Sequence, residues 1–475
     1  MSPEIKAAAS TTWTISPKEQ QLKPNGAEAS QPLTPRFDSK TRRLLCPVPT
    51  IGDTLLHEYK FASNEGEKLH LFVNGRYCDH GLELIRQKGQ ALMRGWSVPG
   101  QWKKGLADEV HEWVILQQPK LWERPPLDRI NLCNGIFNLA TNQLEPHTPG
   151  WLSPVQLPIL YDPGADCPAW DEYLEAALSA DVYREQVTFQ MAALLMIPYT
   201  GAQKALLLQG PRGTGKSRYL AAMRAFLGPE NTSSKSLHAL EENRFACPYL
   251  YGKLANICPD LPSRHLETVS VFKAITGEDF IDAEYKHGKQ FQFRPFSRLL
   301  FSANQPPQSS DATDASLDRW WVIPFTRRFQ DSAQQISAEE LDRRLSKPSE
   351  LSGVLNRALR WVPVVQQQKG IAQTTVMKQA HDEFCAAADP FRVWLAEFVG
   401  DDPDGFEACD DVQSSYFQFR RERGLTAVTV TAFGLELRRH KRGLDKKQRT
   451  VEHRHGTYSL AWCYIGIRLK KQGRT

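Results

Sequence analysis

The chain has 475 residues, of which 24% are charged and 41% hydrophobic, and its formal net charge is +5. This length exceeds what one hydrophobic core organises, so we expect two to four domains. No apolar run approaches the roughly 20 residues that a membrane helix needs, which predicts no membrane span. The nine cysteines are scattered and never form a C-x-x-C pair, which predicts free thiols in a reducing cytoplasm and no zinc site.

The first part of the chain changes from a polar lead to a mixed α/β pattern. Residues 1–45 are rich in Ser, Thr, Pro, Gln and Lys, so we expect them to be disordered. Residues 46–165 are predicted to form a mixed α/β domain, because apolar strand patterns occur with the turn pairs Asn74-Gly75 and Asn134-Gly135 and helical spacing lies between them. Residues 166–200 favour two helices, which would form a collar ahead of the next domain.

The central region, residues 201–372, alternates apolar strands with helical patterns, which indicates an α/β domain with a parallel sheet. The glutamine run 366–368 is typical of a linker, and residues 373–388 are also expected to link two domains. The predicted elements are the strands Ala205–Gln209, Lys253–Ile257 and Ser297–Ala303 and the helices Lys216–Phe226 and Leu351–Val362.

A glycine-rich loop carries the clearest chemical signal. The phosphate-loop pattern G-x-x-x-x-G-K-[ST] is matched by Gly210, Pro211, Arg212, Gly213, Thr214, Gly215, Lys216 and Ser217. An apolar strand precedes this loop and a helical pattern follows it, which is the context that the motif requires. Backbone amides would surround the phosphates of ATP, Lys216 would neutralise their charge, and Ser217 would bind Mg²⁺. The sequence therefore predicts an ATP site.

Two polar residues that follow later strands are candidates for the rest of this site. Asp260 ends the strand pattern that includes Asn256 and Ile257, and Asn304 ends the pattern at Phe301. An acid placed near Mg²⁺ and an amide placed near the attacking water are what hydrolysis needs. Each residue alone also fits a bland reading, since an Asp after a strand is commonly a helix cap and an Asn before Gln-Pro-Pro is commonly a turn residue.

The last region, residues 389–475, combines helical spacing with a basic, alternating end. Residues 411–475 hold 15 Lys/Arg and only 5 Asp/Glu, which suggests a polyanion as partner. Helices followed by basic strands are typical of a winged helix that binds duplex DNA, although a solvated charged face is the alternative. The candidate DNA contacts are Arg438, Arg439, Lys441, Arg442, Lys446 and Lys447.

The order of these motifs resembles the superfamily 3 helicases, in particular the helicase half of primase-helicases of the phage, plasmid and poxvirus type. The resemblance runs from about residue 51 to the C-terminus. It rests on the segments NGIFNL (134–139), LPILYDPGADCPAW (157–170), GPRGTGKS (210–217), NICPDL (256–261), FKAITGEDFIDAEYKHG (272–288), FSANQPP (301–307) and DRWWVIPF (318–325). It implies an AAA+ type core and a hexameric ring.

The resemblance also implies roles for single residues. Lys216 and Ser217 would bind phosphate and Mg²⁺, Asp260 would be the Walker B acid, Asn304 would be sensor 1, and Arg319 would be an arginine finger that acts on the neighbouring subunit's ATP. The family's pore hairpin would lie between the Walker B strand and sensor 1. Its tip would present Lys286, His287 and Lys289 to single-stranded DNA, although these residues taken alone form an ordinary polar hairpin tip.

We therefore expect an ATP-dependent, homo-hexameric DNA helicase that acts in the replication of a phage, plasmid or integrated element. Two alternatives remain open, namely an origin-binding initiator that melts DNA locally and a non-translocating ATPase switch in a regulatory or defence assembly. Fewer than 50 residues precede the matching region, so we expect priming to come from a separate primase.

Overall fold

The computed structural model describes residues 34–178, 183–261, 268–286, 290–304, 314–328, 336–441, 443–452 and 458–470. The chain divides into two compact units, each described by itself below. The first unit comprises residues 1–261, 270–302 and 325–372, and the second comprises residues 262–269, 303–324 and 373–475. None of the described helices is both long enough and apolar enough to cross a membrane.

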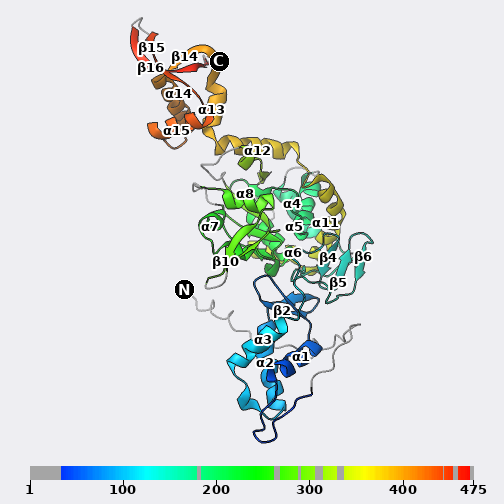
Figure 1. The fold of residues 1–475 in the computed structure, drawn as a ribbon. Helices are drawn as coiled ribbons and strands as arrows, with labels where there is room; N and C mark the ends of the chain where they lie inside the picture. Colours follow the sequence, from blue (N-terminus) through cyan, green and yellow to red (C-terminus); the bar gives the residue numbers. More distant parts are fainter. Residues whose placement is uncertain are drawn as a thin grey trace, which may run out of the picture. The chain divides into compact units, whose positions relative to one another are not determined.

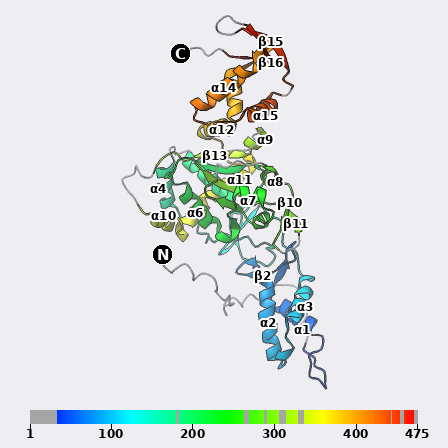
Figure 2. The ribbon, with the colours of Figure 1, turned by 90° about the vertical axis from the view of Figure 1, so that its left-hand side faces the viewer.

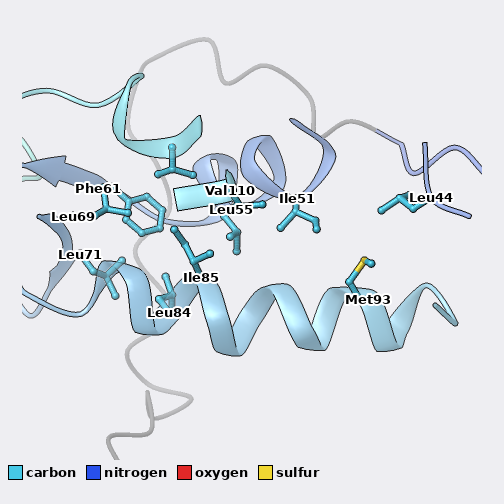
Figure 3. Close-up of a cluster of buried hydrophobic side chains, with 11 residues drawn as sticks. Leu44, Ile51, Leu55, Phe61, Leu69, Leu71, Leu84, Ile85, Met93 and Val110 are labelled. Atoms are coloured by element: carbon cyan, nitrogen blue, oxygen red, sulfur yellow. The ribbon is translucent and has the colours of Figure 1, made fainter. Parts of the chain in front are cut away.

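The N-terminal part of the first unit has three helices beside a three-stranded antiparallel sheet, ordered β1-β2-β3. The turn between β2 and β3 contains Asn74 (φ 50°) and Gly75 (φ 86°), as their Asn-Gly sequence predicts. Apolar residues from all three helices and from β1 and β2 form one buried cluster (Figure 3). The elements are α1 (Pro47–Glu58), β1 (Phe61–Ser63), β2 (Leu69–Val73), β3 (Arg76–Cys78), α2 (Gly81–Gly95) and α3 (Lys104–Ile115).

A second small antiparallel sheet follows, with the order β4-β5-β6. Its strands are β4 (Arg129–Leu132), β5 (Gly135–Asn138) and β6 (Gln143–Glu145). The pair Asn134-Gly135 is the turn of this sheet, because Gly135 pairs with Leu132 across β4 and β5. The residues just before the first domain also have structure, since Phe37 and Leu44 form an isolated antiparallel bridge.

The two helices predicted within residues 166–200, called the collar below, are present. Its elements are α4 (Pro168–Ala177), a π-helical turn at Tyr183–Thr188 and α5 (Phe189–Met196), every residue of which is buried. Helix α11 (Pro348–Gln368) packs against α5 and α4. The glutamines 366–368 form the last turn of α11, so the prediction of a linker there is wrong. Glutamine is a good helix former, and the helix ends only at Lys369, which has φ 54° and precedes Gly370.

The central sheet has five strands in the order β13-β7-β12-β9-β8, and the pairs β8–β9 and β12–β9 are parallel. Its strands β7, β9 and β12 are almost fully buried, as expected for strands covered on both faces. Figure 1 shows helices α4, α5, α6 and α11 gathered around this part of the chain. The strands are β7 (Ala205–Gln209), β8 (Thr232–Ser233), β9 (Ala255–Cys258), β12 (Arg298–Ala303) and β13 (Trp320–Pro324).

Shorter elements connect these strands. An antiparallel pair, β10 (Ile281–Glu284) with β11 (Gln290–Phe293), lies between β9 and β12 in the chain. The helices are α6 (Lys216–Leu227), α7 (Leu237–Glu242), α8 (Ser270–Gly277) and α9 (Asp314–Leu317), followed after β13 by α10 (Ala338–Leu345), and the 3-10 turns are at Pro229–Asn231 and Cys247–Leu250. A further 3-10 turn, Pro99–Gln101, lies between α2 and α3.

Residues 373–388, expected as a linker, form helix α12 (Thr375–Ala388). After it the chain folds as helix, strand, helix, helix, strand, strand, with the strand order β14-β16-β15. Figure 2 shows β15 and β16 side by side, next to helices α14 and α15. The elements are α13 (Pro390–Phe398), β14 (Val399–Ala408), α14 (Cys409–Glu422), α15 (Val430–His440), β15 (Lys446–Glu452) and β16 (Tyr458–Leu469).

Candidate functional site

The phosphate-loop motif forms a tight turn between a buried strand and a helix. Strand β7 ends at Gln209, and helix α6 begins at Lys216. Gly213 (φ 85°) and Gly215 (φ 90°) have left-handed backbones that favour glycine. Gly210 also has a positive φ (156°), and it has a second reason to be glycine, since a Cβ atom there would lie 1.9 Å from the carbonyl oxygen of Phe325. A Cβ on Gly213 would meet no atom within 4 Å, so the loop is open on that side.

The ammonium group of Lys216 is folded back over this loop. Its Nζ atom donates hydrogen bonds to the carbonyl oxygens of Gly210 (2.6 Å) and Pro211 (2.8 Å), and it lies 3.5 Å from Thr214 Oγ1. Burial lowers the pKa of Lys216 below its usual value, whereas the negative charge of Asp260 opposes this shift. Lys216 is therefore a nearly buried cation that donates hydrogen bonds to carbonyl oxygens of the loop. The charge of Asp260 lies close enough to influence its pKa.

The loop is supported from the collar by a residue that sequence reasoning missed. Tyr173 Oη, from helix α4, donates a hydrogen bond to the carbonyl oxygen of Gly215 (2.9 Å). Burial raises the pKa of Tyr173 well above its usual value, so the phenol stays protonated and remains a donor. Glu350 of α11 caps the first turn of helix α4. Its Oε2 atom accepts hydrogen bonds from the backbone amides of Ala169 (3.0 Å) and Trp170 (3.3 Å).

Asp260 follows β9 in a left-handed conformation (φ 60°) and is exposed. Its backbone amide donates a hydrogen bond to Ser302 Oγ (3.2 Å), and the amide of Leu261 donates to the Ser302 carbonyl oxygen (2.6 Å). The end of β9 is thereby fixed to β12, the strand that leads to Asn304. Ser302, which is also buried, is a second residue that no sequence pattern singled out.

The other predicted site residues are not part of the contacts described above. Asn304 is exposed and Arg319 half-buried, and both belong to the second unit, so their roles at the nucleotide remain predictions. Lys286 directly follows Tyr285 beyond β10 and is exposed. The predicted hairpin residues His287 and Lys289 lie outside the described residues, as does Arg442 in the C-terminal domain.

The predicted DNA-binding cations of the C-terminal domain have different surroundings. Three of them form ion pairs: Arg439 with Glu436 (3.5 Å), Lys447 with Asp445 (3.6 Å), and Lys441 with Asp401. Arg438 is exposed on α15, where its Nε atom donates to the carbonyl oxygen of Gly434 (3.1 Å). Lys446 is exposed on β15, with its Nζ atom 5.8 Å from the ring centroids of Trp462 and Tyr464.

Two family models match separate parts of the chain. Residues 208–319, from the end of β7 past the phosphate loop to Arg319, match a family of unknown function (DUF5906). Residues 103–179, which include helix α4 of the collar, match a family described as D5 N terminal like.

Similar solved structures match most of the chain. The apo structure of the NrS-1 C terminal region matches with a TM-score of 0.50 and 13% sequence identity, covering 89% of this chain and 99% of that one. Its A form has a TM-score of 0.46 at 13% identity, covering 88% and 99%. A JCV helicase structure matches a smaller part, covering 46% of this chain and 64% of its own at 14% identity, with a TM-score of 0.28. At 13% identity, the match to the NrS-1 C terminal region shows a similar fold.

Proposed function

We propose that the chain is an ATP-driven DNA helicase of superfamily 3. The observation that carries this proposal is the buried Lys216 ammonium, held at the phosphate loop beside the charge of Asp260. A cation at the start of a helix, within a loop of left-handed glycines, is suited to hold a triphosphate. The parallel central sheet supports this proposal, because phosphate loops of this kind follow a strand of such a sheet.

The loop residues fit ATP with its Mg²⁺. The open side of Gly213 leaves room for phosphates against the loop amides, and Lys216 would exchange its two carbonyl partners for phosphate oxygens. Ser217 is exposed on the first turn of α6 and Asp260 is exposed after β9, so both offer oxygen atoms to the metal. The bound Mg²⁺ would neutralise charge on the β- and γ-phosphates.

In this proposal the ring completes the site. Asn304 would orient the attacking water, and Arg319 of the partner subunit would approach the γ-phosphate, where its fixed charge stabilises the transition state. Closed head-to-tail interfaces of this kind are what a homo-hexameric ring provides. A mixture of Lys216→Ala and Arg319→Ala chains would then regain activity at interfaces that join an intact loop to an intact finger.

The proposed nucleic-acid contacts lie in two places. Lys286, at the end of β10, would contact single-stranded DNA in the ring's pore. The C-terminal domain would bind duplex DNA, because its helix, strand, helix, helix, strand, strand order suits a winged helix with basic side chains on its third helix and its hairpin. Arg438 and Lys446 are exposed on these two elements.

The test is strand displacement on forked DNA with opposite tails, measured together with ATP hydrolysis and nucleotide affinity. We expect the wild-type chain to separate one type of fork and Asp260→Asn to bind ATP without separating either. ATP hydrolysis with no displacement on any fork would contradict a helicase and indicate an ATPase switch. Displacement confined to duplexes with one particular sequence would indicate an origin-binding initiator.

A further inference from the structure

The ribbon of strands β15 and β16 carries an apolar stripe on one face. Tyr458, Leu460 and Trp462 alternate along β16, so their side chains point to the same side of the ribbon. Their exposed fractions are 66%, 66% and 53%. Three large apolar side chains exposed at alternating positions on one face of a strand indicate a binding surface.

This stripe is not needed to build the domain's core. The opposite face of β16 serves that purpose, because Cys463 and Ile467 are buried and Ile467 belongs to the cluster around Phe391 and Trp394. The stripe lies toward the end of the ribbon, where β16 pairs only with β15. Packing in the core of the domain therefore does not explain why the residues of the stripe are large and apolar.

The strand beside the stripe supplies positive charge and polar groups. Lys446 lies over the rings of Trp462 and Tyr464, and Gln448 and Thr450 pair directly with Trp462 and Leu460 on the same face. Lys447 and Arg449 are exposed on the same strand. The face thus combines aromatic rings and hydrogen-bonding side chains with the cation of Lys446, whereas Lys447 and Arg449 alternate to the opposite face of β15.

We propose that this stripe binds unpaired bases of single-stranded DNA. Tyr458 and Trp462 are four positions apart on one strand, which at about 3.3 Å per residue separates them by about 13 Å, so each would hold a separate base. Gln448 and Thr450 would meet the base edges, and Lys446 would meet the phosphates. An anionic lipid surface would leave those two polar side chains without partners in an apolar phase, so DNA fits this face better.

This inference rests on the proposed helicase function and adds a role for the C-terminal domain, which would hold a strand after separation as well as duplex DNA. The winged arrangement would then present two surfaces to DNA. Arg438 on α15 and Lys446 at the start of β15 would contact phosphates, and the apolar stripe of the ribbon would contact unpaired bases.

The test compares an oligothymidylate with an abasic strand of the same length and charge, using the full chain. We expect the double variant Tyr458→Ala/Trp462→Ala to bind the oligothymidylate about 10- to 100-fold more weakly, because two stacked bases are lost. Its affinity for the abasic strand should change less than about twofold, and the dependence on salt should be unchanged because no charge is removed. Trp462→Phe should restore most of the affinity at that position.

Ser459→Ala, on the opposite face of the same strand, is the matched control and should bind both strands like the wild type. An equal loss of affinity for the oligothymidylate and the abasic DNA would mean that the stripe does not bind bases. A lower unfolding temperature of the double variant would mean that the stripe contributes to folding instead. Loss of binding to anionic vesicles, or a changed molecular mass, would assign the stripe to lipid or to a second copy of the chain. A wild-type chain that separates forks and a double variant that binds normally would overturn this inference alone, whereas a wild-type chain that fails on forks overturns the helicase.

Discussion

The phosphate loop and the C-terminal ribbon would recognise their proposed ligands in opposite ways. The loop is one run of eight residues whose backbone is set by its own glycines, and its lysine bonds to carbonyls five and six positions away. The surface of the ribbon exists only once β15 and β16 pair, because Lys446 meets Trp462 and Tyr464 through strand register. A site formed by the backbone of one short loop is determined by a short sequence motif. A site formed by side chains of two strands depends on how those strands pair.

The loop side of this comparison makes the largest prediction. Lys216→Ala should lower ATP hydrolysis at least about 100-fold, because the described part of the loop offers no second buried cation to the phosphates. Arg224→Ala, an exposed residue on the same helix, removes the same charge and should leave hydrolysis unchanged. Steady-state ATPase rates decide this, and a Lys216→Ala rate within threefold of wild type would contradict the assignment.

A second prediction tests how much the close approach of Phe325 adds to the cost of replacing a loop glycine that has a positive φ. Gly210→Ala places a Cβ atom 1.9 Å from the Phe325 carbonyl oxygen, so we expect the free energy of unfolding to fall by about 3 kcal/mol. Gly213→Ala meets no atom within 4 Å and should cost only about 1 kcal/mol, for its left-handed backbone. Denaturant unfolding of both variants measures the difference, and equal losses would show that the approach of Phe325 is not what requires glycine at position 210.

The ribbon side makes the smallest prediction. The double variant Arg438→Ala/Lys446→Ala should leave ATP hydrolysis unchanged and reduce the slope of log affinity against log salt for duplex DNA by about 2, because two phosphate contacts are lost. Arg423→Ala is the control, since the side chain of Arg423, just after α14, pairs with Glu397 of α13 at 2.9 Å. Titrations with duplex DNA at four salt concentrations would measure the slope. An unaltered slope would show that Arg438 and Lys446 do not contact duplex phosphates.

The elements near the loop could be predicted because their patterns are local. The apolar run before Gly210 forms β7, Lys216 begins a helix, and the strands before Asp260 and Asn304 form β9 and β12. The Asn-Gly turn at Asn74 was predicted for the same reason. In each case a few consecutive residues carry the whole signal.

The parts that could not be predicted depend on distant partners. Strand β14 has the sequence VGDDPDGFEA, which has low strand propensity, and it forms because it pairs with β16. A helix was predicted around Tyr173, but the pattern did not indicate that the hydroxyl of Tyr173 reaches Gly215. Ser302 likewise gains its role only when β9 and β12 become neighbours.

The contact of Glu350 with helix α4 has a consequence for the order of folding. Glu350 follows Ala169 by 181 residues, and Arg357 binds Asp171 through two hydrogen bonds across a similar separation. Contacts between residues so far apart form late, because a long loop must close first. During synthesis, helix α4 and its Tyr173 therefore stay without their support until residue 357 has left the ribosome. The nascent chain would have its phosphate loop long before it could hold a nucleotide firmly.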